Sequence, residues 1–156
     1  WKKNDVVELK LPMKIVNSRW FNNSVGVERG PLVYALKIKE NWIEVKNTDK
    51  YGNYWEVLPE SDWNYGLWEE CIKQPGTSFV VTEKKNITDN PWNVQNAPIE
   101  IKTKGKRIPG WKMYNGDAGP LPYSTINYLK DSPAEDIVLI PYGCSTLRIS
   151  EFPVVR

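Results

Sequence analysis

Few residues of this chain have side chains that could do chemistry, and the 156-residue sequence contains no His at all. Ser-His and Cys-His nucleophile pairs and His-ligated metal sites therefore cannot be built from it. Paired carboxylates are the usual groups that cleave glycosidic bonds. The chain supplies that residue type, although most Glu and Asp side chains are simply solvated at strand ends and in loops. We expect no catalytic residue and no metal site among the candidate carboxylates Glu56, Glu60, Asp62, Glu69, Glu70 and Asp117.

The two Cys residues lie far apart in the sequence and form no Cys-x-Cys pair. Cys144 lies between two strand-like segments, which favours a small buried side chain. Cys71 follows Glu69 and Glu70, whose charges would raise rather than lower a thiol pKa, and this argues against a reactive thiolate. A disulfide between Cys71 and Cys144 stays open, because sequence cannot place their Cα atoms within bridging distance.

Aromatic residues are the remaining candidates for a site. A sugar-binding surface needs an aromatic platform beside hydrogen-bonding groups, and several Trp and Tyr residues lie among Asn, Asp and Glu. Packing in the core is the rival interpretation and is favoured for the group, because large aromatic side chains dominate the cores of β-domains. Trp111, beside the turn-rich residues 115–122, is the best candidate for an exposed platform. The candidate carbohydrate-binding residues are Trp63, Trp68, Trp111 and Tyr114, with Trp92 in a similar setting.

Composition excludes several classes of protein. The chain is 40% apolar and 26% charged, as in a globular protein, and no apolar run reaches the ~20 residues of a membrane helix. A net charge of +2, spread along the chain, favours neither nucleic acid nor anionic lipid as a partner. The four basic residues within 102–107 are expected at a solvated strand end. The chain begins with Trp1 and shows no signal-peptide pattern, so we expect a piece of a longer protein.

Twelve Pro, ten Gly, eight Trp and eight Tyr predict an all-β class, with many short strands joined by turns. The organising stretch is residues 29–38, where a Gly30-Pro31 turn precedes a two-residue period. Leu32, Tyr34, Leu36 and Ile38 fall on one face, and Val33, Ala35 and Lys37 fall on the other. This pattern predicts a central strand covered on both sides.

Further strands are expected at roughly ten-residue spacing, which together with the absence of a helical period predicts an antiparallel β-sandwich, either immunoglobulin-like or jelly-roll-like. Gly105 is expected to end the strand that begins at Ile99. The sequence leaves open whether residues 54–58 pair with residues 63–68. One domain over residues 1–156 is the default. A boundary within 39–49 would instead leave 1–38 as the last strands of a preceding sandwich and 39–156 as a second one. The expected strands are residues 5–11, 54–58, 63–68, 77–82, 99–103, 137–140 and 146–152.

Three separated segments resemble one family. They are residues 1–13, the Gly-Pro-Leu-Val-Tyr motif at 30–34 and residues 139–153, with weaker similarity at 58–67 and 98–122. In this order they resemble the region that follows the catalytic barrel in glycoside hydrolase family 127, the β-L-arabinofuranosidase-like proteins.

The resemblance implies a Cys nucleophile on a zinc ion, held by further Cys and a Glu, in an α-helical barrel upstream of this segment. It also implies a parent enzyme that removes arabinofuranose-type sugars from plant glycans in the periplasm or outside the cell. We expect this chain to be the non-catalytic C-terminal β-sandwich, with the barrel as its partner and with self-association as a homodimer left open. The alternatives are an independent carbohydrate-binding module and an immunoglobulin-like protein interaction domain.

Overall fold

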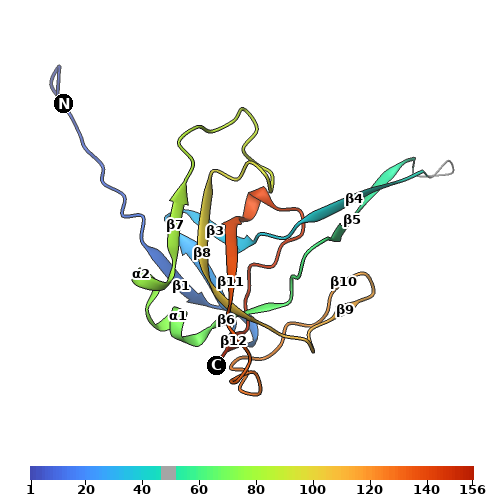
Figure 1. Cartoon of the computed structure of the whole chain (residues 1–156). Helices are drawn as coiled ribbons and strands as arrows, with labels where there is room; N and C mark the ends of the chain where they lie inside the picture. Colours follow the sequence, from blue (N-terminus) through green and yellow to red (C-terminus); the bar gives the residue numbers. More distant parts are fainter. Residues whose placement is uncertain (47–51) are drawn as a thin grey trace.

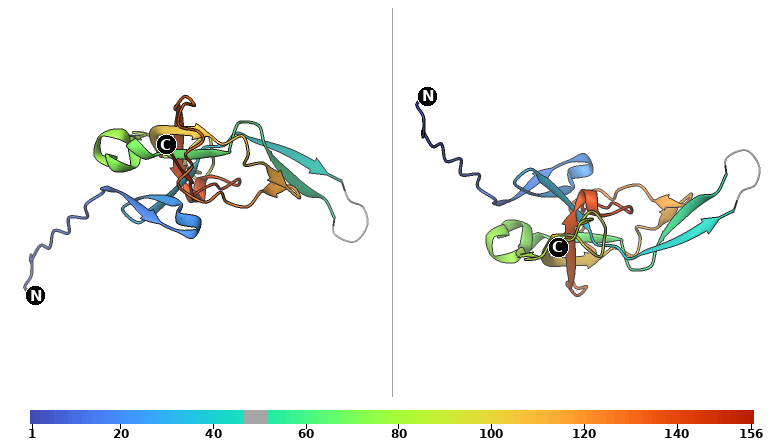
Figure 2. Two further views of the ribbon diagram at one scale, coloured as in Figure 1. Left: turned by 90° about the horizontal axis from the view of Figure 1, so that it is seen from below. Right: turned by 90° about the horizontal axis from the view of Figure 1, so that it is seen from above.

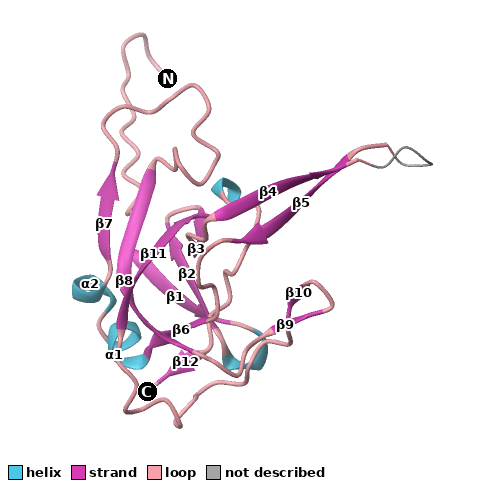
Figure 3. Cartoon of the chain, turned by 45° about the vertical axis from the view of Figure 1, so that its right-hand side comes forward, coloured by secondary structure: helices cyan, strands magenta, loops and turns pink. Residues whose placement is uncertain are grey.

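The computed structural model describes residues 1–46 and 52–156, and its strands form one large sheet and two small hairpins (Figures 1 and 3). The all-β prediction is confirmed. The elements in chain order are β1 (Ile15–Arg19), η1 (Phe21–Asn23), β2 (Val25–Arg29), β3 (Leu32–Leu36), β4 (Glu40–Val45), β5 (Tyr54–Pro59), β6 (Tyr65–Trp68), α1 (Glu69–Lys73), α2 (Pro75–Ser78), β7 (Val80–Glu83), β8 (Ile99–Arg107), β9 (Met113–Tyr114), β10 (Asp117–Ala118), β11 (Glu135–Pro141), η2 (Tyr142–Cys144) and β12 (Val154–Val155).

The large sheet has eight strands in the order β1-β2-β3-β11-β8-β6-β12, with β7 paired to β8 beside this path. Its pairs are antiparallel except β12, which runs parallel to β6. The sheet curls, because Val25 of β2 forms a reciprocal main-chain bridge with Phe152, two residues before β12. One curled sheet therefore encloses the core; the immunoglobulin-like or jelly-roll-like sandwich stays a prediction.

The predicted central strand is confirmed as β3, which pairs with β2 on one side and β11 on the other. Gly30 adopts φ +59°, the left-handed conformation that the two-residue turn between Arg29 and Leu32 requires. Tyr34 and Leu36 point into the main core, Ala35 is buried on the opposite face, and Val33 is exposed. Both faces are thus covered in the middle of the strand, while its start is covered on one face only.

The strand predicted at residues 5–11 is wrong. Residues 1–14 form an extended tail that leaves the body of the molecule (Figure 1). Leu9 is 77% exposed although it lies on the apolar side of the alternating pattern. The pattern is that of a half-buried strand, but among the described residues no neighbouring strand pairs with it.

Two further strand predictions need correction. The strand predicted at residues 77–82 starts too early, because residues 77 and 78 belong to α2 and the strand is β7. Residues 146–152 form no regular strand, although Leu147 and Ile149 do pack against the main core as their inward placement predicted. The pairing that the sequence left open does not occur: residues 54–58 and 63–68 do not pair with each other, because β5 pairs with β4 and β6 pairs with β8 and β12.

Gly105 does not end a strand but lies inside β8, which was predicted too short. A Cβ atom at Gly105 would lie 2.7 Å from the main-chain oxygen of Gly66, and one at Gly66 would lie 2.7 Å from that of Pro153. The two glycines therefore allow the close approach of β8, β6 and the segment before β12.

Two short helices interrupt the expected run of strands. Pro75 opens α2, where its missing N–H costs nothing, and Glu69 and Glu70 lie in the first turn of α1. Among the described residues, no helix has the length and apolar character to cross a membrane.

The hairpin β4–β5 projects from the body on the side opposite to the N-terminal tail (Figure 2). The loop predicted at residues 47–53 lies largely outside the described residues. The boundary proposed within residues 39–49 would put β3 before it and β11 after it. These two strands are neighbours in one sheet.

Candidate functional site

A concave surface surrounds Trp63, and we call it the Trp63 hollow. Its volume is about 520 Å³. The loop between β5 and β6 forms one side, and the end of β8 with the segment leading to β9 forms the other. Its lining residues are Asp62, Trp63, Asn64, Arg107, Pro109, Trp111, Lys112 and Met113.

The aromatic wall of the hollow is held in place by packing and hydrogen bonds. Trp63 meets Trp111 edge to face, with ring centroids 5.2 Å apart and an interplanar angle of 71°. The Trp111 indole N–H donates to the main-chain oxygen of Gly119 at 2.9 Å. The Asn64 side-chain amide donates to the oxygens of Ile108 and Trp111, at 2.8 and 3.1 Å. The wall is therefore formed before any ligand arrives.

The polar side of the hollow is an ion pair. Arg107 Nη2 lies 2.6 Å from Asp62 Oδ1, and each side chain is about half exposed. The pair sits on the rim, where water screens it, so its contribution to stability is small. Lys112 adds a second positive charge to the lining.

The structure brings together two of the four candidate sugar-binding residues, Trp63 and Trp111. The expectation that Trp111 is an exposed platform is wrong, because the residue is only 4% exposed and belongs to a core cluster with Ile108 and Val155. The segment near Trp111 does fold into a tight hairpin, since Asn115 and Gly116 both take positive φ between β9 and β10.

Tyr114 and Trp68 lie outside the Trp63 hollow. Tyr114 is 67% exposed on β9 and does not line the hollow, although the preceding Met113 does. Trp68 lines a different hollow of about 570 Å³, together with Lys106 and Arg156. Trp92 is exposed at a third place, beside Tyr142.

Lys106 is a residue whose role the sequence did not reveal. It was expected at a solvated strand end with its basic neighbours, but it is only 4% exposed. Its ammonium group donates to the main-chain oxygens of Leu129, Lys130 and Arg156 at 3.1, 2.7 and 2.9 Å. It also lies 6.0 Å from the centroid of the Trp68 ring. The expectation is wrong for Lys106 because β8 pairs with β6 there and the 127–132 turn covers the side chain.

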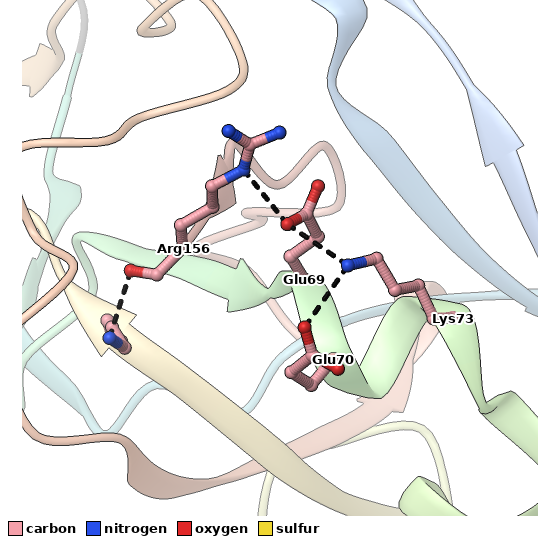
Figure 4. A network of polar contacts seen from close by, with 5 residues as sticks. Glu69, Glu70, Lys73 and Arg156 are labelled. Atoms are coloured by element: carbon pink, nitrogen blue, oxygen red, sulfur yellow. Dashed lines mark hydrogen bonds and ion pairs between the residues drawn. The ribbon is translucent and has the colours of Figure 1, made fainter.

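Beside Lys106, charged side chains form a network on α1 (Figure 4). Glu69 accepts from Arg156 Nε at 3.0 Å and lies 3.3 Å from Lys73, which also contacts Glu70 at 3.1 Å. Burial would raise the pKa of Glu69, but the hydrogen bonds from Arg156 and Lys73 outweigh it and hold the pKa below its ordinary value. A general acid needs the opposite shift, so Glu69 is not suited to protonate a leaving group.

Both Cys residues are buried and free, so the possible disulfide does not form. Cys71 belongs to the main core and Cys144 to a separate cluster with Val94 and Ile140. Burial raises the pKa of the Cys144 thiol, which keeps it protonated near neutral pH. Within residues 1–46 and 52–156, no three Cys, Asp or Glu side chains gather closely enough to hold a metal ion.

A second surface is the hairpin β4–β5, which carries large apolar side chains into water. Trp42 and Trp55 lie on one face in a T-shaped contact, with centroids 6.3 Å apart. The register places Ile43, Tyr54 and Leu58 on the other face. All five side chains are exposed.

No protein-family model, no curated protein and no solved structure matches the chain. The resemblance to glycoside hydrolase family 127 therefore stays a prediction.

Proposed function

We propose that the chain is a non-catalytic β-domain that packs against the catalytic barrel of its own parent protein, an enzyme similar to glycoside hydrolase family 127. The observation that carries the proposal is the hairpin β4–β5, which extends from the body (Figure 2). It has exposed apolar side chains on both faces. The sequence resemblance identifies the expected partner.

The hairpin has a physical reason to need a partner. A two-stranded hairpin alone in water is marginally stable, because neither face is covered. Contiguous apolar surface of this kind marks interaction sites in soluble proteins. The exposed ring of Trp55 and the exposed side chains of Ile43 and Leu58 would bury apolar area on a partner, each contributing about 25 cal/mol per Å² removed from water.

The environments of the thiol and carboxylate side chains support the non-catalytic part of the proposal. An activated thiolate needs an exposed, electropositive setting, whereas Cys71 and Cys144 are buried in separate clusters. Asp62 is paired with Arg107, and the pKa of Glu69 is lowered. The zinc and its thiolate ligands would belong to the barrel. We therefore expect the purified chain to hydrolyse no aryl arabinofuranoside, with or without added zinc.

The docking proposal is tested in the full-length parent protein. The double variant Ile43→Ser, Leu58→Ser removes apolar surface from one face of the hairpin, and Val80→Ser on β7 is the control because Val80 is also exposed. We expect the double variant to lower the melting temperature of the parent and the control to leave it unchanged. Equal melting temperatures, an upstream sequence without a helical barrel carrying clustered Cys and Glu, or turnover by the isolated chain would each overturn the proposal.

A further inference from the structure

We infer that the Trp63 hollow binds one residue of a neutral glycan, with the sugar ring against Trp63 and vicinal hydroxyls on the Asp62 and Arg107 pair. This inference does not rest on the docking proposal, because the hollow and the exposed face of the hairpin are different surfaces. Its basis is the combination of shape, a fixed aromatic wall and a preformed ion pair.

The size and lining of the hollow suit a small ligand group. Its volume of about 520 Å³ falls inside the range of about 300–1,000 Å³ that is usual for small-molecule sites. Apolar surface from Trp63, Pro109 and Met113 stands next to the charged groups of Asp62 and Arg107. A sugar ring has the matching character, with C–H groups on its faces and hydroxyl groups around its edge.

The aromatic wall is rigid, which lowers the entropic cost of binding. Trp63 is fixed by its edge-to-face contact with Trp111, and Trp111 is fixed by its hydrogen bond to Gly119. Both hydrogens of the Asn64 amide are used to hold the loop that contains Trp111. The Trp63 ring itself is only partly buried and also borders two neighbouring hollows, so one part of it remains open to a ligand.

The ion pair supplies the hydrogen bonds. In the described part of the chain, Asp62 is the only acidic group that Arg107 contacts, at a single guanidinium nitrogen. Guanidinium has five N–H donors and carboxylate accepts at two oxygens, so both groups retain bonding capacity. One hydroxyl of a vicinal diol can donate to Asp62 while its neighbour accepts from Arg107, and such charge-assisted bonds are stronger than neutral ones.

The same pair favours a neutral sugar over an acidic one. A uronate would have to compete with Asp62 for Arg107, and the Asp62 charge would repel it. Lys112 also lines the hollow and offers a weaker point contact. We therefore expect neutral polysaccharides to bind better than polygalacturonate.

Affinity electrophoresis and isothermal titration of the purified chain test the inference, with soluble linear arabinan, arabinoxylan and galactomannan as neutral probes and polygalacturonate as the acidic probe. We expect retardation by at least one neutral probe. Asp62→Asn should lower the association constant for that probe by about tenfold or more, because it replaces a charged carboxylate acceptor with a neutral amide. Asp62 lies at the rim, so this change leaves the fold intact.

Asp136→Asn is the control, since Asp136 also forms an ion pair with a basic residue of β8, Lys104, at 2.9 Å, but lies outside the hollow and is more exposed than Asp62. Its association constant should stay within about twofold of the wild-type value. Three results would refute the inference: no neutral probe retards the wild-type chain, only polygalacturonate does so, or Asp62→Asn binds as tightly as Asp136→Asn.

Discussion

Replacing Lys106 by Met should destabilise the fold far more than the same change at the exposed Lys104 of β8. The Lys106 ammonium donates to three main-chain oxygens, of Leu129, Lys130 and Arg156, and in doing so joins β8 to the 127–132 turn and to the chain after β12. Met fills a similar volume but donates nothing, so the packing remains while the three acceptors lose their partner.

The expected loss follows from the hydrogen bonds. A net contribution of about 1 kcal/mol for each gives a total of about 3 kcal/mol. The total stays this low because Met also removes the cost of burying an ammonium group, and because Lys130 and Arg156 are exposed residues where water can replace the lost donor. At about 2–4 °C per kcal/mol for a domain of this size, the melting temperature should fall by about 6–12 °C.

The measurement is thermal and urea unfolding of the wild-type chain and two variants. Lys104→Met is the control, because Lys104 lies two residues away on the same strand and its ion pair with Asp136 is exposed. That variant should lose no more than about 1 kcal/mol. If Lys106→Met and Lys104→Met unfold at the same temperature, the buried ammonium does not stabilise the fold as argued.

Three further predictions concern the core, the thiols and high pH. Leu36→Ala should cost about 2–5 kcal/mol in a urea melt and Lys10→Ala less than about 0.5, because only Leu36 is buried; equal small losses would contradict the central position of β3. A colorimetric reagent should find Cys71 and Cys144 unreactive in the native chain and both reactive in guanidinium without reductant, since both are buried and free. Burial and a hydrogen bond to Glu135 raise the pKa of Tyr65 to about 12. The folded state then keeps a proton that the unfolded state releases, so the free energy of unfolding should fall between about pH 10 and 12, by up to about 1.4 kcal/mol per pH unit, and Tyr65→Phe should flatten that decline.

Local patterns predicted the parts of the fold that depend on local sequence. The alternation around Tyr34 and the Gly30 turn identified β3 and its hairpin, and the apolar run of residues 137–140 identified β11. The tail at residues 5–11 has an equally clear alternation but forms no strand, because a strand also needs a neighbour to accept its hydrogen bonds. Periodicity reports which side of a segment could be buried, and it carries no information on whether a partner is present.

In the candidate site, too, the residue types could be predicted from the sequence but the contacts between distant residues could not. Trp63 and Trp111 were identified by residue type, yet their edge-to-face contact depends on residues 108–111 folding back onto Asn64. Arg107 was read as one member of a basic run, although it faces Asp62 while Lys106 points into the interior. Extending the alternation of β8 beyond Gly105 would place Arg107 with the buried Ile101 and Lys106 with the exposed Lys104, which is the reverse of what the structure has, so the pattern could not have separated them.

The bridge between Val25 and Phe152 has a consequence for how the chain folds. It joins residues near opposite ends of the sequence, and the neighbouring hydrogen bond from Ser24 to Glu151 spans 127 positions. Contacts of such long range must await closure of a very large loop, which slows folding in proteins dominated by non-local strand pairing. Until residues 151–155 arrive during synthesis, Val25 at the start of β2 lacks its bridge partner and β6 lacks one neighbouring strand, and exposed strand edges of this kind are prone to aggregate. Expression yield should therefore depend strongly on temperature and on the integrity of the last few residues.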